Sequence, residues 1–308
     1  IVACLVGSEM CIRDRYNLTY HSGNQQVSIN IFYRDEHLQG RVSGPLKVIH
    51  NLLRSLDDCE VEYAINEDRF DNTLFLHWDQ PQIDAYQTLR NKDKLLVGPQ
   101  IWPFEPKFNL LTEYRRVLVP SRWCVDSYNK SFPNTKTAIW PVAIYKPEIT
   151  NNITTDCLIY HKNRSQQDLE YVKDMLSRRR LTYTQLQYGS YTQQNFRDAL
   201  SSVRFCVIID NTESQGIAIQ EMMYANKPLF VWDQTVWDHM GEQYAVESTS
   251  VPYWDPICGE RVRDASQLNL YLDIFLQAFD GYNPAKFVEK NLSAKPTVKI
   301  LLDLFNEN

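Results

Sequence analysis

Residues 204–233, RFCVIIDNTESQGIAIQEMMYANKPLFVWD, are the stretch that decides the fold. The stretch opens with Arg204–Asp210, an apolar run rich in β-branched residues that predicts a buried strand. A short polar turn with Gly216 follows, then a predicted helix at Gln215–Ala225 and a second predicted strand at Pro228–Trp232. A strand, a crossover helix and another strand in this order indicate a parallel sheet covered by helices.

The same alternation extends over most of the chain. Further strands are expected at Val27–Tyr33, Glu60–Ile65, Asn72–Trp78, Lys94–Val97, Arg116–Val119, Thr137–Val142, Cys157–Tyr160 and Thr182–Leu186. Helices are expected at Gly44–Leu56, Arg122–Ser131, Gln166–Arg179 and Gln193–Ser202, with helical periods at Leu268–Phe279 and Pro296–Phe305. Ser121 is expected to cap the helix that it precedes. The pattern predicts an α/β protein with two Rossmann-like halves, residues 16–145 and 146–285, and a C-terminal helical segment at 286–308.

Composition excludes several classes of function. The 308 residues are 44% hydrophobic and 23% charged, with a formal net charge of -6, so no overall positive field attracts nucleic acid. The seven cysteines show no spacing typical of a zinc site, and buried free thiols are favoured over disulfides. No apolar run reaches the roughly 18 residues of a transmembrane helix. A cytoplasmic protein without a metal cofactor is expected.

The first fifteen residues are interpreted separately. The sequence LVGSEMCIRD at residues 5–14 resembles one reading frame of a transposase-type sequencing adapter. Residues 1–15 are therefore expected to be a non-native leader from a gene assembled out of environmental reads, and they are left out of the fold prediction. The alternative is that IVACLVG forms a true first strand.

The turn at residues 211–216 is where chemistry is expected. Ligands of open α/β sheets bind beyond the carboxyl ends of the strands, and the free N–H groups at a helix start favour phosphate. The absent side chain of Gly216 lets a ligand approach the backbone. Glu213 and Glu221 flank the turn and can accept hydrogen bonds from hydroxyl groups. A ligand both phosphorylated and hydroxylated, such as a nucleotide sugar, fits this pattern, although a helix whose dipole is merely compensated by acidic residues fits it too.

ESQGIAIQE followed by ANKPLFVWD resembles the E-x7-E signature of retaining GT-B glycosyltransferases of the family-4-like group. The resemblance implies two lobes with parallel sheets and a cleft between them, with the acceptor on the N-terminal side and the nucleotide-sugar donor on the C-terminal side. It implies that Glu213 contacts the donor sugar and Glu221 the ribose. It also implies that the amides of the turn face the diphosphate, which here are those of Ser214, Gln215, Gly216 and Ile217.

Other segments extend this resemblance. Ser43 and Gly44 resemble the glycine-containing acceptor-side loop of the N-terminal lobe, and Tyr188-Gly189 resembles the loop near the nucleobase. VLVPSRW at 117–123, IWPVAI at 139–144 and NPAKFVEKNLS at 283–293 resemble a late N-lobe strand, the interdomain segment and the helix that crosses back. Two positions depart from the pattern, because Tyr145 replaces a common Asp and Asn226 a common Gly.

The resemblance also suggests catalytic groups. Lys162 and Arg164 occupy the region where family members carry an Arg and a Lys that neutralise the diphosphate, although their spacing is shorter than usual. His77 ends a predicted strand and resembles a histidine that faces the reacting sugar. A solvated charge pair and a structural histidine are the alternatives for these residues.

The activity implied is transfer of a sugar from a nucleotide-diphosphate sugar to a glycan, lipid or protein acceptor, with retention of configuration and without a metal. Peripheral association with a membrane is compatible with it. A nucleotide-sugar epimerase of the same shape and a non-catalytic sugar- or nucleotide-binding protein are the alternatives.

Overall fold

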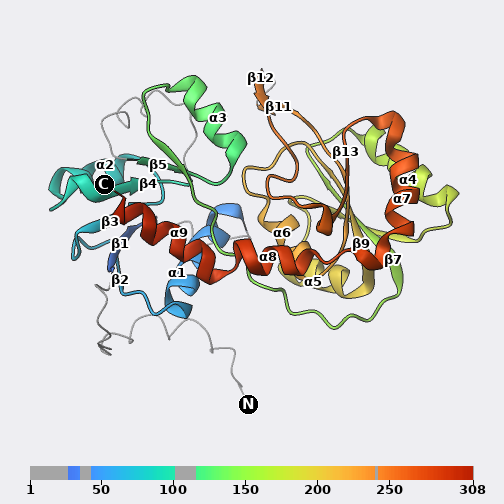
Figure 1. The fold of residues 1–308 in the computed structure, drawn as a ribbon, viewed down its shortest axis with the longest axis horizontal. Coiled ribbons are helices and arrows are strands. Elements are labelled where there is room, and N and C mark those ends of the chain that lie inside the picture. The colour runs from blue at the N-terminus through green and yellow to red at the C-terminus, as the bar shows by residue number, and fades with distance from the viewer. Residues whose placement is uncertain (1–26, 35–42, 101–115, 240–241, 308) are drawn as a thin grey trace, which may run out of the picture.

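The computed structural model describes residues 27–34, 43–100, 116–239 and 242–307. These residues form two α/β lobes side by side, each built on its own sheet (Figure 1). The interpretation of residues 1–15 as a leader lies outside the described residues. No helix in the described part of the chain is long and apolar enough to cross a membrane.

The N-terminal lobe is built on a parallel sheet with the strand order β2-β1-β3-β4-β5-β6 among the described residues. Its strands are β1 (Ile29–Phe32), β2 (Tyr63–Ile65), β3 (Asn72–Phe75), β4 (Leu95–Val97), β5 (Arg116–Val119) and β6 (Thr137–Ile139). Its helices are α1 (Gly44–Asp58), α2 (Gln80–Thr88) and α3 (Arg122–Ser131). Each neighbouring pair of strands runs parallel, as the alternation of strands and helices predicts.

The C-terminal lobe has a second parallel sheet, with the order β13-β10-β9-β7-β8. Its strands are β7 (Thr155–Lys162), β8 (Tyr183–Gln187), β9 (Val203–Asp210), β10 (Leu229–Trp232) and β13 (Gly259–Val262). Its helices are α4 (Gln166–Arg178), α5 (Gln193–Ser202), α6 (Ile217–Tyr224) and α7 (Leu268–Gln277). An antiparallel hairpin of β11 (Val236–His239) and β12 (Glu242–Glu247) projects from this lobe (Figure 1, top).

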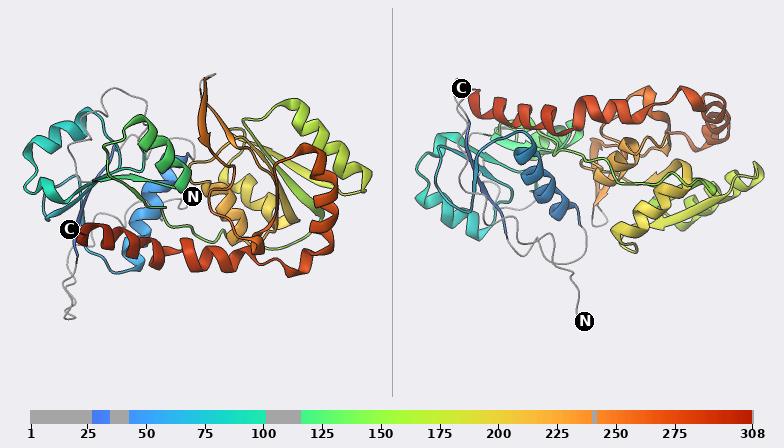
Figure 2. Two further views of the ribbon diagram at one scale, coloured as in Figure 1. Left: turned by 45° about the horizontal axis from the view of Figure 1, so that its top comes forward. Right: turned by 90° about the horizontal axis from the view of Figure 1, so that it is seen from below.

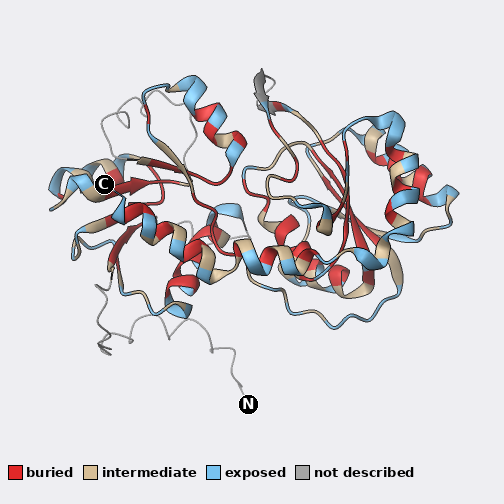
Figure 3. Ribbon diagram, in the orientation of Figure 1, coloured by how far each residue is buried: buried red, intermediate tan, exposed pale blue. Residues whose placement is uncertain are grey.

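Strand β9 is the centre of the C-terminal core. Its residues alternate between two hydrophobic clusters, with Cys206 and Ile208 facing one and Val207 and Ile209 facing the other. Both faces of the strand are therefore covered, which explains its uninterrupted apolar sequence. Burial is concentrated in the strands of both lobes (Figure 3).

Two C-terminal helices connect the lobes. Helix α8 (Pro284–Leu292) packs in the C-terminal core through Val288, and α9 (Ala294–Asn306) packs in the N-terminal core through Leu301. They run along one side of both lobes (Figure 2). Trp140 fixes the crossing, because its Nε1 donates to the carbonyl of Thr297 at 3.1 Å.

Several expected elements differ in the structure. The predicted helix at 215–225 begins only at Ile217, because Gly216 has a left-handed backbone with φ 80°. Ser121 makes no side-chain cap, and its hydroxyl donates instead to Cys124 Sγ at 3.3 Å. Helix α2 was not predicted because its sequence, QPQIDAYQT, is mostly polar. Strands β11, β12 and β13 were also missed.

Candidate active site

The pairing of two strands forms the base of the candidate site. Lys162 is the last residue of β7 and Asp210 the last of β9, and the parallel register places them opposite each other. Glu213 follows three residues after Asp210, in the turn that leads to α6. The carboxyl ends of adjacent strands thus bring one basic and two acidic side chains together.

Lys162 is held between these carboxyl groups. Its Nζ donates to Glu213 Oε1 at 2.5 Å and lies 3.9 Å from Asp210 Oδ2. The lysine and glutamate side chains are only 12% and 13% exposed. Burial lowers the pKa of Lys162, but the charges of Glu213 and Asp210 raise it by more, so the net pKa lies above its ordinary value. Lys162 is therefore a permanent cation in the site.

Asp210 was not among the predicted site residues. Its Oδ1 accepts from the main-chain N–H of Asn211 at 2.7 Å, whereas its buried Oδ2 has no hydrogen-bond partner among the described residues. Burial, followed by the charge of Glu213, raises the pKa of Asp210 well above its ordinary value, and Lys162 offsets only part of the rise. A lone acidic residue ending an otherwise apolar strand was the signal for it in the sequence.

The start of α6 provides unpaired main-chain donors. Gly216 precedes the helix in the left-handed region, and no described residue accepts a hydrogen bond from the N–H groups of residues 214–217. A Cβ at Gly216 would stand 3.4 Å from Glu213 Cβ, so the first reason for glycine here is its backbone conformation. Free N–H groups at a helix start form a site suited to an anion.

The same turn is where the two lobes meet. Trp123 of α3 donates from Nε1 to the carbonyl of Glu213 at 2.8 Å, and Cys124 Sγ donates to the carbonyl of Ser214 at 3.8 Å. The buried side chain of Gln215 bonds to both the N–H and the carbonyl of Val142, at 3.1 and 2.8 Å. The side chain of Gln215 therefore connects the lobes, and its main-chain N–H has no acceptor among the described residues.

Glu221 also receives a partner from the other lobe. It lies buried in α6, and its Oε2 accepts a hydrogen bond from Nζ of Lys47 in α1. Burial raises the pKa of Glu221 above its ordinary value, and the Lys47 charge offsets part of this rise. Lys47 was not among the predicted residues, since nothing in its local sequence distinguishes it from a surface lysine.

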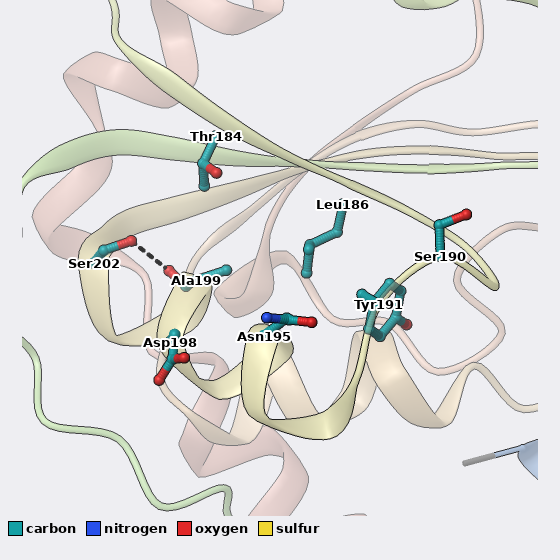
Figure 4. A pocket seen from close by; sticks show the side chains of 8 residues that line it. All are labelled: Thr184, Leu186, Ser190, Tyr191, Asn195, Asp198, Ala199 and Ser202. Carbon is teal, nitrogen blue, oxygen red and sulfur yellow. Dashed lines mark hydrogen bonds between the residues drawn. The ribbon is translucent and has the colours of Figure 1, made fainter. Parts of the chain in front are cut away.

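Aromatic residues line the side of the site next to β8. The Tyr188 ring is half exposed, and Nζ of Lys162 lies 4.5 Å from its centroid. Gly189, with φ 80°, turns the chain toward Tyr191, whose hydroxyl donates to that of Tyr160 at 3.3 Å. An open groove of about 400 Å³ runs from this turn between β8 and α5 (Figure 4). It is lined by Thr184, Leu186, Ser190, Tyr191, Asn195, Asp198, Ala199 and Ser202.

Arg164 has a different environment from Lys162. Its Nε donates to Asp168 at 2.9 Å, and its Nη1 donates to the carbonyls of Asp210 and Trp232 at 3.3 and 3.4 Å. The guanidinium also lies 4.6 Å from the centroid of a Trp232 ring. These contacts tie together the ends of two strands, and none of them supports the predicted diphosphate contact, which stays a prediction.

The remaining predicted residues belong to the N-terminal lobe. His77 is buried just beyond the end of β3. Ser43 caps α1, since its hydroxyl accepts from the N–H of Leu46 at 3.3 Å, and Gly44 is the first residue of that helix. Ser43 and Gly44 therefore lie one turn before Lys47. Their roles toward an acceptor, and that of His77 toward a sugar, stay predictions.

Known structures share this two-lobed architecture. Sucrose-phosphate synthase from Thermosynechococcus elongatus aligns over 91% of this chain and 98% of its own, with 10% identity and a TM-score of 0.57. The lipopolysaccharide outer core galactosyltransferase WaaB aligns over 91% and 99%, with 11% identity and a TM-score of 0.55. T4 phage β-glucosyltransferase, in complex with its substrate UDP-glucose, aligns over 91% and 100%, with 10% identity and a TM-score of 0.51.

Sequence comparisons add nothing to this likeness. Models of known protein families give no match, and neither do the sequences of curated proteins. At identities near 10% the structural likeness concerns the fold alone. The chain has the GT-B fold of these glycosyltransferases, as the sequence predicts.

Proposed function

We propose that the protein is a glycosyltransferase that moves a sugar from a nucleotide-diphosphate sugar to an acceptor with retention of anomeric configuration. One observation carries this proposal. At the meeting point of two GT-B lobes, the N–H groups of residues 214–217, which have no acceptor among the described residues, lie between Glu213 and Glu221, and Glu213 is paired with the 12% exposed side chain of Lys162. N–H groups that can bind an anion, flanked by carboxylates that can accept hydrogen bonds from hydroxyl groups, suit a nucleotide sugar.

The donor would take the place of contacts that the protein makes with itself. The diphosphate would lie against the helix start and the Lys162 ammonium, while a sugar hydroxyl would replace this lysine on Glu213. The ribose hydroxyls would reach Glu221, and the base would lie near the Tyr188–Gly189 turn. In each exchange the ammonium would gain a phosphate oxygen and the carboxylate would stay hydrogen-bonded, which limits the free-energy cost of binding.

The chemical step needs stabilisation of the leaving group. When the bond from the anomeric carbon to the phosphate oxygen breaks, its electron pair stays on the diphosphate, and the acceptor oxygen forms the new bond and gives its proton to the departing diphosphate. Lys162 and the helix-start amides are fixed before the reaction and would stabilise the developing charge. The pKa of Lys162, raised by the neighbouring Glu213 and Asp210, makes this side chain a cation in the unbound site. Retention is the part of the proposal that rests on the resemblance of residues 213–221.

A donor screen tests the proposal. Purified protein is incubated with UDP-, GDP- and ADP-sugars and a mixture of acceptors, starting with UDP-glucose because T4 phage β-glucosyltransferase uses it. We expect acceptor-dependent release of one nucleoside diphosphate and a product whose anomeric NMR signal has the donor's configuration. Glu213→Gln should abolish release while the fold persists. An epimerised donor without transfer, or donor binding without any turnover, would contradict the proposal.

A further inference from the structure

Lys47 is the basic residue that crosses from one lobe to the other. It lies in the first turn of α1, and its Nζ reaches Glu221 in α6 of the opposite lobe. The Lys47 side chain is 18% exposed and that of Glu221 11%, and the ammonium lies 5.6 Å from the centroid of the Phe196 ring. Among the residues that the structure describes, Glu221 is the only acidic partner of Lys47.

The charges around the turn are balanced without a donor. Two ammonium groups, Lys47 and Lys162, pair with two carboxylates, Glu221 and Glu213. A donor whose hydroxyls bind both carboxylates takes both lysines away from their partners. A buried ammonium without a partner is costly, so each lysine needs a new anion. The donor itself supplies one in its diphosphate.

Arg164 is bonded within its own lobe. Its Nε donates to Asp168 and its Nη1 to the carbonyl groups at the ends of β9 and β10, and its side chain is only 7% exposed. Lys162 is then the cation from the C-terminal lobe that faces the helix start. A second cation can come from Lys47, which already reaches the same helix.

We propose that Lys47 is a phosphate-binding residue of the site, contributed by the opposite lobe. When a nucleotide-sugar donor binds, the Lys47 ammonium leaves Glu221 and pairs with an oxygen of the diphosphate. A ribose hydroxyl then donates a hydrogen bond to the Glu221 carboxylate. Recognition of the diphosphate thereby requires both lobes, so the donor holds them together. This inference rests on the proposed function, because it assumes a nucleoside diphosphate at the helix start.

The test separates the proposed contact of Lys47 with phosphate from its ion pair with Glu221. Because Lys47→Met removes both the Glu221 pair and the phosphate contact, the lysine is also replaced in a Glu221→Gln background, where no ion pair is lost. Calorimetry measures the binding of UDP, GDP and ADP, and of the nucleoside belonging to the diphosphate that binds best. Lys47→Arg keeps the charge, and Lys136→Met removes an exposed lysine of the same lobe as a control.

We expect Lys47→Met in the Glu221→Gln background to weaken binding of the diphosphate by about tenfold or more and binding of the nucleoside by less than about twofold. Lys47→Arg and Lys136→Met should retain most of the affinity. Unchanged diphosphate binding, or equal losses for diphosphate and nucleoside, would overturn the role of Lys47 but not the proposed function. A wild-type protein that binds none of the three diphosphates would overturn the proposed function and this inference together.

Discussion

The ion pair between Lys162 and Glu213 should stabilise the fold far more than a surface pair of similar length. Its matched control is the pair of Lys299 and Asp303 in α9, whose N–O distance is 2.6 Å against 2.5 Å. The control side chains are 74% and 53% exposed, and those of the candidate site 12% and 13%. The N–O distance is therefore nearly constant, whereas exposure to solvent differs strongly.

Burial sets the expected size of the effect. At 2.5 Å two unit charges attract by about 2 kcal/mol in bulk water and about 7 kcal/mol at an effective dielectric constant of about 20. Desolvation of the buried groups cancels part of this gain, which leaves an expected coupling of about 2–4 kcal/mol for Lys162 and Glu213. For Lys299 and Asp303, four residues apart on an exposed helix, about 0.3–0.5 kcal/mol is expected.

Two double-mutant cycles measure these couplings. The variants are Lys162→Met and Glu213→Gln, alone and together, and Lys299→Met and Asp303→Asn in the same way. Urea unfolding is followed by tryptophan fluorescence and far-UV circular dichroism, and coincident transitions show that the lobes unfold together. If the transitions separate, the comparison uses the transition of each pair's own lobe. A coupling for Lys162 and Glu213 no larger than the control would falsify the claim that this site holds a buried, organised ion pair.

Three further predictions concern stability, and urea unfolding measures each of them. Burial raises the pKa of Asp210 in the folded state, so the wild type loses stability as pH rises from the ordinary pKa of 3.8 to the raised pKa. Asp210→Asn should be the more stable protein at pH 8, and the difference should vanish below pH 3.8. Gly216→Ala should cost about 1–2 kcal/mol because of the left-handed backbone, whereas Gly281→Ala, with open space and no positive φ, should change little. Leu301→Ala should cost about 2–5 kcal/mol because it leaves a cavity in the N-terminal core, and the half-buried Leu302→Ala less.

The fold could be predicted from strands that are covered on both faces. The apolar residues 205–209 lie in β9, where adjacent residues face different hydrophobic clusters, so no polar residue interrupts them. Edge strand β13 gave no such signal. Its sequence is GERV, and only its first and last residues are buried. There Gly259 is required by packing, since a Cβ would stand 1.9 Å from the carbonyl oxygen of Leu229.

Only those features of the site that depend on neighbouring residues in the sequence could be predicted. The sequence places Lys162 and Asp210 at strand ends, but the order of the strands in the sheet makes them neighbours, and this order depends on the whole lobe. The spacing of Lys162 and Arg164 also gives no sign that their side chains have different partners. Lys162 reaches Glu213 in the turn before α6, whereas Arg164 donates to the main-chain carbonyl at the end of β9.

The contact between Lys47 and Glu221 shows why the contacts between the lobes could not be predicted from the sequence. The two residues are 174 positions apart and belong to different lobes, so no helical or strand period relates them. Their pairing depends on how the lobes face each other, which Gln215 and Val142 fix on one side and α8 and α9 on another. A helix dipole compensated by two glutamates was the simpler interpretation of residues 213–221. The structure instead pairs each glutamate with a lysine, one from its own lobe and one from the other, and the proposed donor would offer each lysine a phosphate oxygen and each glutamate a hydroxyl group.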